Sequence, residues 1–154
     1  DTLVTACPIC LRTFRGDYHR DGIRLLHHSQ FIAELMSQGL LTAERGGASF
    51  AYHDPCELGR GLGIYEEPRA VLGTIGRLEE VADNRDKALC CGGSLAHLGL
   101  DLAQRNMIVS GVCAKFEATG ADFLVTSCPM CKKSLSRSAK MRVVDIAEAV
   151  AGII

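Results

Sequence analysis

The chain has 154 residues, and its 17 Lys and Arg are balanced by 18 Asp and Glu, for a formal net charge of -1 at pH 7. This balance argues against a nucleic-acid-binding protein, which normally carries a basic excess. Hydrophobic residues make up 47% and charged residues 23% of the sequence, which excludes a disordered chain and predicts a folded protein with a sizeable core.

The sequence carries no sign of a membrane span or of a secretion signal. No apolar run approaches the ~18–20 residues that a membrane-spanning helix needs, and no signal peptide opens the chain. We therefore expect a cytoplasmic protein. The first residue is Asp1 and not Met, which leads us to expect a piece or a processed product of a longer protein.

Short apolar runs alternate with helical patterns along the chain. The runs are typical of buried strands in a parallel sheet. This alternation predicts a Rossmann-like α/β fold, with a mainly parallel sheet and flanking helices. The predicted strands are Leu3–Ala6, Ile23–Leu26, Ser49–Tyr52 and Phe123–Thr126.

Helical spacing of apolar residues predicts two longer helices. Ser29 is the expected cap of the first helix, and Gly39 is its expected end. The second helix is expected to end near Gly120. The apolar residues that we expect on its inner face are Leu100, Ala103, Met107, Ile108, Gly111, Val112 and Phe116.

Two segments of the chain repeat one another. Residues 1–10 and 122–131 are identical at seven of ten positions, at a constant offset of 121. Each segment ends in a C-x-x-C sequence whose first Cys is followed by Pro, a residue favoured in the first turn of a helix. Further on, 32–34 and 146–148 share the sequence Ile-Ala-Glu. The pattern predicts a duplicated unit, with a boundary at Gly46-Gly47.

The cysteines are grouped in a way that points to metal or redox chemistry. Adjacent cysteines rarely form a disulfide with each other, and C-x-x-C pairs in an intracellular chain are typical of metal or redox sites. The alternative is packing of buried thiols, which we expect for Cys113 because it lies within a predicted helix. The other seven cysteines are Cys7, Cys10, Cys56, Cys90, Cys91, Cys128 and Cys131.

Five of these thiols are expected to meet at one edge of the sheet. Ligands of an open α/β sheet gather outside the carboxyl ends of the strands, and Cys56 and Cys128 each follow such an end. Gly92-Gly93 would let backbone donors approach the sulfur atoms of the Cys90-Cys91 pair. Five thiolates exceed a four-coordinate zinc site and suit a polynuclear iron–sulfur cluster. A zinc site that uses four of the five stays open.

Other polar residues near these cysteines have weaker predictions. Arg60, Arg85 and Lys132 are expected either to offset the anionic charge of the thiolates or to be solvated surface cations. His53 is a candidate proton donor, although it also suits a strand end. His27-His28 are expected at a strand end and not as ligands. The Gly-rich stretch 59–63 lacks the spacing of a dinucleotide-binding loop.

The cysteine spacing resembles that of the CCG cysteine-rich domain. The resemblance covers nearly the whole chain and extends to His53-Asp54-Pro55-Cys56 and Leu58-Gly59-Arg60, although Ser94 stands where members often have a third glycine. Members include heterodisulfide reductase subunits and iron–sulfur subunits of glycolate, lactate and glycerol-3-phosphate oxidising systems. The resemblance implies that a 4Fe-4S cluster, in some members non-cubane, is held by Cys56, Cys90, Cys91, Cys128 and Cys131.

The resemblance also implies a domain organisation. Residues 1–46 would be the C-terminal part of a first CCG-type repeat, and residues 47–154 would be a complete second repeat packed with it as one α/β unit. Cys7 and Cys10 would close an incomplete first motif.

Three functions are compatible with this reading. The first is an iron–sulfur oxidoreductase of heterodisulfide reductase type that reduces a thiol–disulfide couple. The second is an electron-transfer subunit of a quinone-linked dehydrogenase, and the third is a zinc-bearing structural domain. Expected partners are an electron-transfer subunit or ferredoxin-type domain, through which the chain would reach the inner face of the membrane, and a small thiol, disulfide or quinone.

Overall fold

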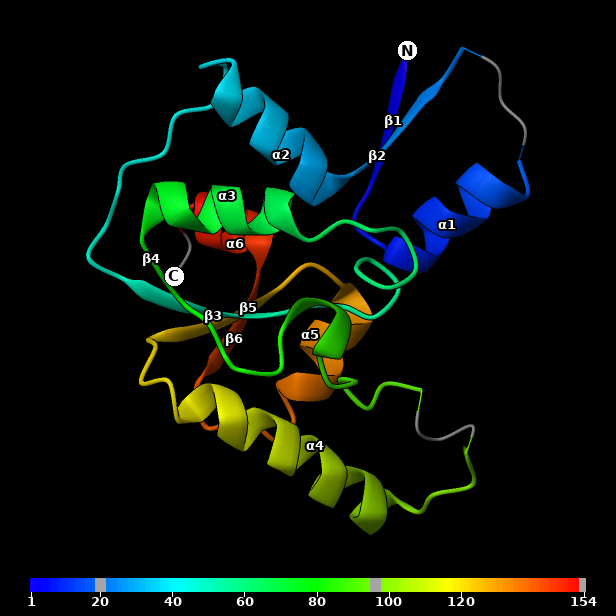
Figure 1. Ribbon diagram of the computed structural model, residues 1–154, viewed down its shortest axis with the longest axis vertical. Coiled ribbons are helices and arrows are strands. Elements are labelled where there is room, and N and C mark those ends of the chain that lie inside the picture. Colours follow the sequence, from blue (N-terminus) through cyan, green and yellow to red (C-terminus); the bar gives the residue numbers. More distant parts are fainter. Residues whose placement is uncertain (19–21, 95–97, 153–154) are drawn as a thin grey trace.

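The computed structural model describes residues 1–18, 22–94 and 98–152, and it folds into alternating strands and helices (Figure 1). The strands are β1 (Thr2–Thr5), β2 (Arg24–His27), β3 (Ser49–His53), β4 (Arg77–Glu79), β5 (Phe123–Thr126) and β6 (Arg142–Asp145). The helices are α1 (Pro8–Gly16), α2 (His28–Ser37), α3 (Glu66–Ile75), α4 (Leu102–Glu117), α5 (Pro129–Leu135) and α6 (Ile146–Val150), with a 3-10 turn, η1, at Arg85–Lys87.

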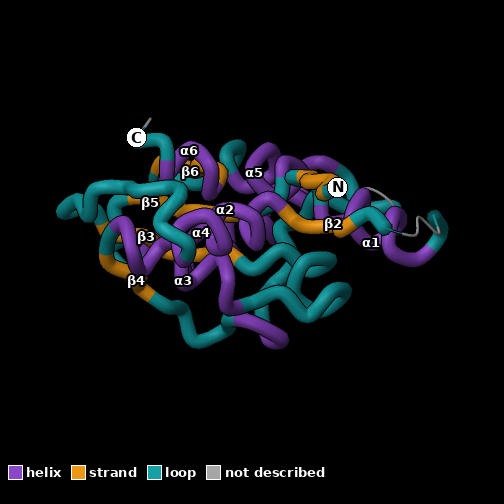
Figure 2. The backbone as a smooth tube through the Cα atoms, turned by 90° about the horizontal axis from the view of Figure 1, so that it is seen from above, coloured by secondary structure: helices purple, strands orange, loops and turns teal. Residues whose placement is uncertain are grey.

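All strand pairs in the described chain are parallel, as the sequence predicted, but they form two sheets. The larger sheet has the order β4-β3-β5-β6, and β1 pairs with β2 in a separate two-stranded sheet. Figures 1 and 2 both show the β1–β2 pair to one side of the larger sheet. The predicted α/β class with parallel strands and flanking helices is therefore confirmed.

Alternate residues of each strand point to opposite faces of the larger sheet. Both faces carry apolar side chains, and helices cover both of them. Phe50 and Tyr52 of β3 pack with Val71 and Leu72 of α3, together with α6. On the other face, Ala51 packs with residues of α4 and α5. Two apolar layers thus hold β3 and β5 rigidly at the centre, and β3 is buried along its whole length.

The β1–β2 sheet is less buried than the sequence predicted. Val4 of β1 is 38% exposed, so β1 is not the fully buried strand that its apolar run suggested. The unit is tied to the rest of the protein by Leu11 of α1, which packs with Leu58 and Ile64 in the segment that follows β3. This contact places α1 against the loop that follows Cys56.

The first predicted helix begins two residues earlier than expected. The cap is His27 and not Ser29, because the His27 ring accepts the Ser29 N–H while Gln30 reaches back to the His27 N–H. The predicted end is confirmed: Gly39 has φ +69°. The Leu40 N–H then donates to Leu35 O, which closes the helix in a Schellman motif.

The second predicted helix ends where expected but turns a different face to the core. Gly120 has φ +71° just beyond the end of α4. The buried residues of this helix are Val109, Val112, Cys113 and Phe116. By contrast, Met107 is 74% exposed, so the predicted inner face is wrong for the first half of α4. Leu102 and Ile108 of the same half are also exposed, at 59% and 44%.

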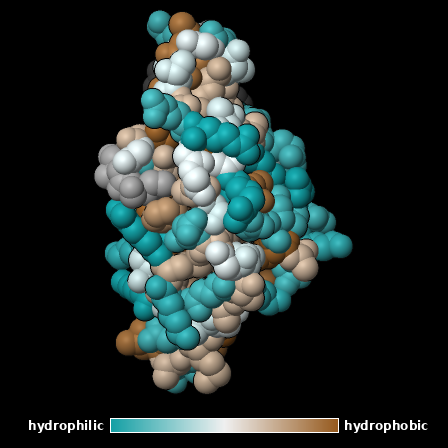
Figure 3. All heavy atoms as spheres, turned by 90° about the vertical axis from the view of Figure 1, so that its left-hand side faces the viewer, coloured by the Kyte–Doolittle hydropathy of each residue, from teal (hydrophilic) through white to brown (hydrophobic). Residues whose placement is uncertain are grey.

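The surface carries hydrophobic residues singly and not as one large patch on the face shown in Figure 3, where hydrophobic spheres lie scattered among hydrophilic ones. Within residues 1–18, 22–94 and 98–152, no helix has the length and apolar character needed to cross a membrane.

Candidate functional site

Three loops bring the predicted cysteines to the carboxyl edge of the larger sheet. Cys56 follows β3, and Cys128 follows β5 as the extended cap residue of α5. Pro129 occupies the first turn of α5, as the sequence predicted, and Cys131 lies in the same turn. The Cys90-Cys91 pair comes from the long connection between β4 and α4.

The thiols of Cys90, Cys91, Cys128 and Cys131 form one chain of hydrogen bonds. Cys131 bonds both Cys91 and Cys128, and Cys90 bonds Cys91. Burial raises the pKa of Cys56, and the nearby charge of Cys91 raises it further by a smaller amount. The structure therefore brings together all five of the cysteines that the sequence singled out at this edge.

This arrangement makes Cys91 the most acidic thiol of the group. Hydrogen bonds from Cys131 and Cys90 hold the pKa of Cys91 far below its usual range, against the opposing effect of burial. The Cys131 bond also lowers the pKa of Cys128 to about 7. Cys131 and Cys90 stay protonated as donors, with raised pKa values. A bound metal centre would release these protons and take over the role of neutralising the sulfur charge.

Glycine is favoured at each of the two positions after the Cys90-Cys91 pair, for a different physical reason at each. Gly92 has φ +79°, a conformation that other residues adopt at a cost. Gly93 donates its N–H to Cys91 Sγ at 3.4 Å. A Cβ at Gly93 would lie 2.7 Å from Met130 Cγ and 3.4 Å from Cys91 Sγ. The backbone must therefore approach the sulfur closely here, as the sequence predicted.

A buried ion pair fixes the loop that carries Cys56 to the segment that leads to the cysteine pair. Asp54 accepts two hydrogen bonds from the Arg69 guanidinium, at 2.7 and 2.8 Å. The Arg69 side chain is only 5% exposed and also bonds Glu80 at 2.6 Å. Asp54 accepts, in addition, the N–H of Arg85 at 2.9 Å. Arg85 has φ +56°, so this contact holds a residue in a conformation that is costly for a side chain other than glycine.

Two more side chains near Cys56 hold the same segment. His53 Nε2 lies 3.1 Å from the carbonyl oxygen of Leu89. Arg60 donates to the carbonyl oxygens of Asp86 and Ala88, at 3.1 and 2.7 Å. Cys56 is thus flanked by residues that position the loop ending in Cys90. The sequence analysis singled out His53 and Arg60 but did not predict the carbonyl oxygens that they contact. Every residue has a backbone carbonyl, so the residue types do not show which one is used.

His53 is buried, and its ring contacts are structural. Its edge meets the Phe116 ring at a centroid distance of 5.8 Å, and burial lowers its pKa, so the ring is neutral at pH 7. The contact with Leu89 O requires the proton on Nε2. These contacts favour a positioning role for His53, and its role as a proton donor stays a prediction.

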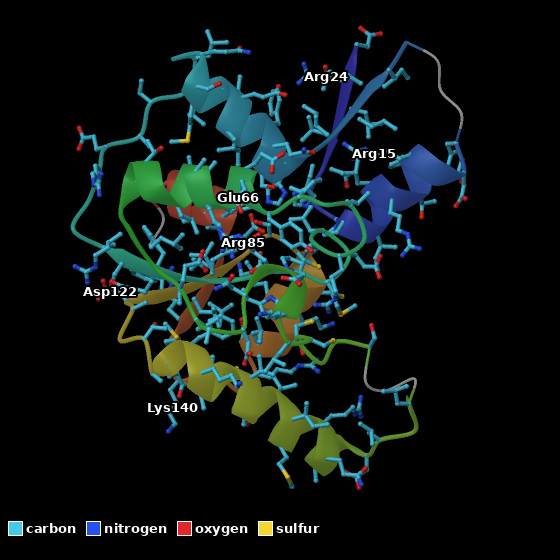
Figure 4. The ribbon with its side chains drawn as sticks, in the orientation of Figure 1. Arg15, Arg24, Glu66, Arg85, Asp122 and Lys140 are labelled. Carbon is cyan, nitrogen blue, oxygen red and sulfur yellow. The ribbon has the colours of Figure 1, made fainter. Side chains whose placement is uncertain are left out.

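The three cations that the sequence placed near the cysteines have other partners. Arg85 pairs with Glu66 at 2.7 Å, and Figure 4 shows these two side chains close together beside α3. Lys132 donates to Glu148 at 2.6 Å. Burial raises the pKa of the Cys56 thiol, and of these three cations it is Arg60 that lowers it, by a smaller amount.

His27, His28 and the other three cysteines lie outside this group. His27 ends β2 as predicted, whereas His28 begins α2 and bonds Asp145 at 2.9 Å. Cys113 is buried in the core, which confirms its packing role, and burial raises its pKa to about 11. The Cys7 and Cys10 thiols are hydrogen-bonded to each other at the start of α1. All eight cysteines are free thiols.

The donor set fits an iron–sulfur cluster by its chemistry. Thiolate sulfur is the usual protein ligand of such clusters, and the sulfur atoms here come from three separate loops. Across the described residues, no three His, Cys, Asp or Glu side chains converge on a point that would hold a single metal ion. The thiols instead donate to one another, as protonated cysteines do.

The chain is similar to known iron–sulfur and redox proteins. It is 32% identical over 165 residues to a subunit of the dihydromethanophenazine:CoB–CoM heterodisulfide reductase of Methanosarcina mazei, a match that covers 95% of this chain and 39% of the relative. It is 37% identical over 133 residues to a "Probable membrane-anchored ferredoxin" of Chromohalobacter salexigens, covering 81% and 20%. It is 25% identical over 166 residues to "EtfAB:quinone oxidoreductase" of Syntrophomonas wolfei, covering 95% and 23%.

The matched region of each relative is thus less than two fifths of its length. The cysteine-rich domain family, CCG, matches residues 50–136, which span β3 to the end of α5 and carry all five cysteines of the site. The chain belongs to the CCG cysteine-rich domain family.

Proposed function

We propose that this chain is the cluster-binding part of an iron–sulfur oxidoreductase. The observation that carries the proposal is that three loops carry the five motif cysteines to the carboxyl edge of the larger parallel sheet, where the Gly93 N–H donates to Cys91 Sγ. The proposed ligands of a 4Fe-4S cluster, cubane or non-cubane, are Cys56, Cys90, Cys91, Cys128 and Cys131.

The bound cluster would supply one-electron steps, and the chain's own residues would prepare the site for it. Cys91 and Cys128 are the thiols with the lowered pKa values, so they would be the first to offer thiolate ligands. The N–H of Gly93 would stay on Cys91 Sγ and tune its basicity. Asp54 and Arg69 would keep the loops of Cys56 and Cys91 at a fixed separation.

The proposed reaction is reduction of a thiol–disulfide couple, as the name of the Methanosarcina mazei relative suggests. Electron transfer between a dehydrogenase and a quinone or another carrier is the second candidate, and the ferredoxin and quinone oxidoreductase relatives favour it. In either case the proposed partner is an electron-transfer subunit or ferredoxin-type domain. The proposed location is the cytoplasm, where C-x-x-C and C-C groupings are kept reduced for metal or redox chemistry.

We also propose that residues 1–46 and 47–154 derive from a duplicated CCG-type unit. The strand pairs support this: β1 with β2, and β5 with β6, are parallel with matching registers, Thr2 opposite Arg24 and Phe123 opposite Arg142. In such a unit, Cys7 and Cys10 correspond to Cys128 and Cys131.

The test is anaerobic reconstitution followed by counting of iron, sulfide and zinc. We expect about four irons and matching sulfide per chain, with an iron–sulfur absorption band. Cys91→Ser should lose the cluster, whereas Cys113→Ser, a matched change of a buried thiol outside the motif, should keep it. Tight binding of one zinc with no uptake of iron would refute the proposal and leave the zinc-bearing domain.

Electron-transfer and enzymatic roles are separable in the reconstituted protein. Reduction of a disulfide substrate with an artificial electron donor is expected for the first candidate. A protein that passes electrons to a quinone analogue but leaves disulfides unreduced would support the second.

A further inference from the structure

A small cavity lies on the far side of Gly92 and Gly93 from the cysteines, between α4 and α5. Its free volume is about 150 Å³. Leu102, Val109 and Met130 supply its apolar lining. We call it the α4–α5 cavity.

The wall between this cavity and the cysteine group is thin. Gly93 lines the cavity and donates its N–H to Cys91 Sγ at 3.4 Å. Met130, which also lines the cavity, lies between Cys128 and Cys131 in sequence. Ser134, on the same wall, donates to the carbonyl oxygen of Cys91 at 2.6 Å. A molecule in the cavity would therefore have one end beside the sulfur atoms.

The cavity is rimmed by positive charges for which the described residues offer no carboxylate partner. Arg105, Lys133 and Arg137 line it, and none of its described lining residues is acidic. Within the described part of the chain, Arg105 bonds only the carbonyl oxygen of Asp101, at 3.3 Å, and the ammonium and guanidinium groups of Lys133 and Arg137 form no ion pair.

Most other cations of the second unit do have carboxylate partners. Lys132, next to Lys133 in sequence, is held by Glu148, Arg69 by Asp54 and Glu80, and Lys115 by Asp83. Arg105, Lys133 and Arg137 thus form a group of three cations at one concave site that also has an apolar floor, which is the composition of a small-ligand site. Their combined charge selects an anion.

We propose that the α4–α5 cavity binds a small organic anion through its carboxylate, sulfonate or phosphate group. Arg105, Lys133 and Arg137 contact the anionic group, and the aliphatic part lies against Leu102 and Met130. The role of this anion as a substrate rests on the proposed function. If the cysteines hold a redox cluster, the bound anion is the substrate, and its other end lies against the wall formed by Gly93.

The test is a titration with butanoate, methanesulfonate and inorganic phosphate, followed by the NMR shift of the Gly93 amide in the diamagnetic, cluster-free protein. Calorimetry repeats the titration on the reconstituted protein. We expect at least one anion to shift the Gly93 amide saturably, with an affinity that falls as salt rises. The triple change Arg105→Gln, Lys133→Gln and Arg137→Gln should weaken binding ~10-fold or more. Lys140→Gln, a change of an exposed cation outside the cavity (Figure 4), should leave it unaltered.

The outcomes separate the cavity from the cluster. If none of the three anions moves the Gly93 amide, or if Lys140→Gln weakens binding as much as the triple change, the cavity proposal is overturned, whatever the iron content. Binding of an acidic protein in place of every small anion overturns it too. Saturable anion binding to a protein that never takes up iron would keep the cavity and refute the proposed function. Circular dichroism checks that the variants fold.

Discussion

The β1–α1–β2–α2 and β5–α5–β6–α6 regions share their order of elements and their strand register, but among the described residues their C-x-x-C thiols have different neighbours. In the first, Cys7 is half-buried, Cys10 is exposed, and the two thiols are hydrogen-bonded to each other. In the second, Cys128 and Cys131 are buried, and Cys131 also bonds Cys91. A C-x-x-C sequence on a strand–helix corner is therefore not sufficient: the site depends on loops that come from β3 and β4.

The largest expected effect comes from removing one thiol in each region. Cys131→Ala should abolish cluster uptake, because Cys131 joins Cys91 and Cys128. Cys10→Ala should leave uptake intact, since its thiol is exposed and interacts with Cys7 and not with the motif cysteines of the larger sheet. Iron and sulfide counting after anaerobic reconstitution measures both. Loss of iron in both variants would show that the two regions share one centre.

The second prediction compares two ion pairs of the segment after β3, a buried pair with α3 and an exposed pair with α1. Arg69→Met leaves the buried Asp54 carboxylate without its counter-ion, with the Arg85 N–H still donating to it, and should cost about 3–5 kcal/mol in the free energy of unfolding. Arg12→Met removes the exposed pair of α1 with Glu57 and should cost at most about 1 kcal/mol. Urea denaturation of the cluster-free protein checks both, and equal losses would contradict the contrast.

The third prediction concerns Gly93, whose backbone lies close to Met130 and to the Cys91 sulfur. Gly93→Ala should destabilise the protein by roughly 1–3 kcal/mol, because its Cβ would crowd Met130 and Cys91. Gly73→Ala, inside α3 with nothing within 4 Å of the new Cβ, should stabilise by about 0.5–1 kcal/mol. Thermal unfolding measures the two changes. A neutral Gly93→Ala would mean that Met130 moves aside without cost.

The smallest expected effect concerns helix caps. His27 caps α2 and Asp145 caps α6, each in a capping box. Burial, the largest cause, lowers the pKa of His27 to about 3 from 6.5. The unfolded chain therefore binds the proton more readily, so the stability from the neutral ring is complete above pH 6.5 and is lost as the pH falls toward 3.

His27→Asn keeps a capping side chain and removes this titration. Between about pH 6.5 and 5.5, we expect the unvaried protein to lose about 1 kcal/mol more than the variant. Denaturation curves at several pH values measure the difference. Parallel pH dependence of the two proteins would show that His27 is not the titrating group.

Much of the fold follows from local sequence signals. Predicted strands at 49–52 and 123–126 match β3 and β5 to within one residue, because continuous apolar runs leave few alternatives to a buried strand. Gly39 and Gly120 marked helix ends correctly, since only a left-handed residue closes these turns easily. Strands β4 and β6 were missed, because Arg77–Glu79 and Arg142–Asp145 are short and begin and end in charged residues.

The shared Ile-Ala-Glu sequence shows how a local match misleads. His28 and Ile146 open α2 and α6 after caps at the same register, so Ile32 stands one helical turn further along its helix than Ile146 does. The two triplets occupy the same helix face, and this explains the resemblance without making them equivalent positions. The strand registers carry the correspondence better, because a slip of one residue would turn every side chain to the opposite face.

The sequence by itself determined the chemistry of this protein: thiols in a C…CC-G…C-x-x-C pattern, and strand–helix alternation that sends strand ends to one edge. These are properties of residue type and spacing, and they act locally. Only the tertiary structure decided which thiol is acidic, which of the two C-x-x-C corners is buried, and that Asp54, His53 and Arg60 hold the loop ending in Cys90. Those features depend on contacts between segments remote in the chain and on backbone carbonyls, which no residue pattern encodes.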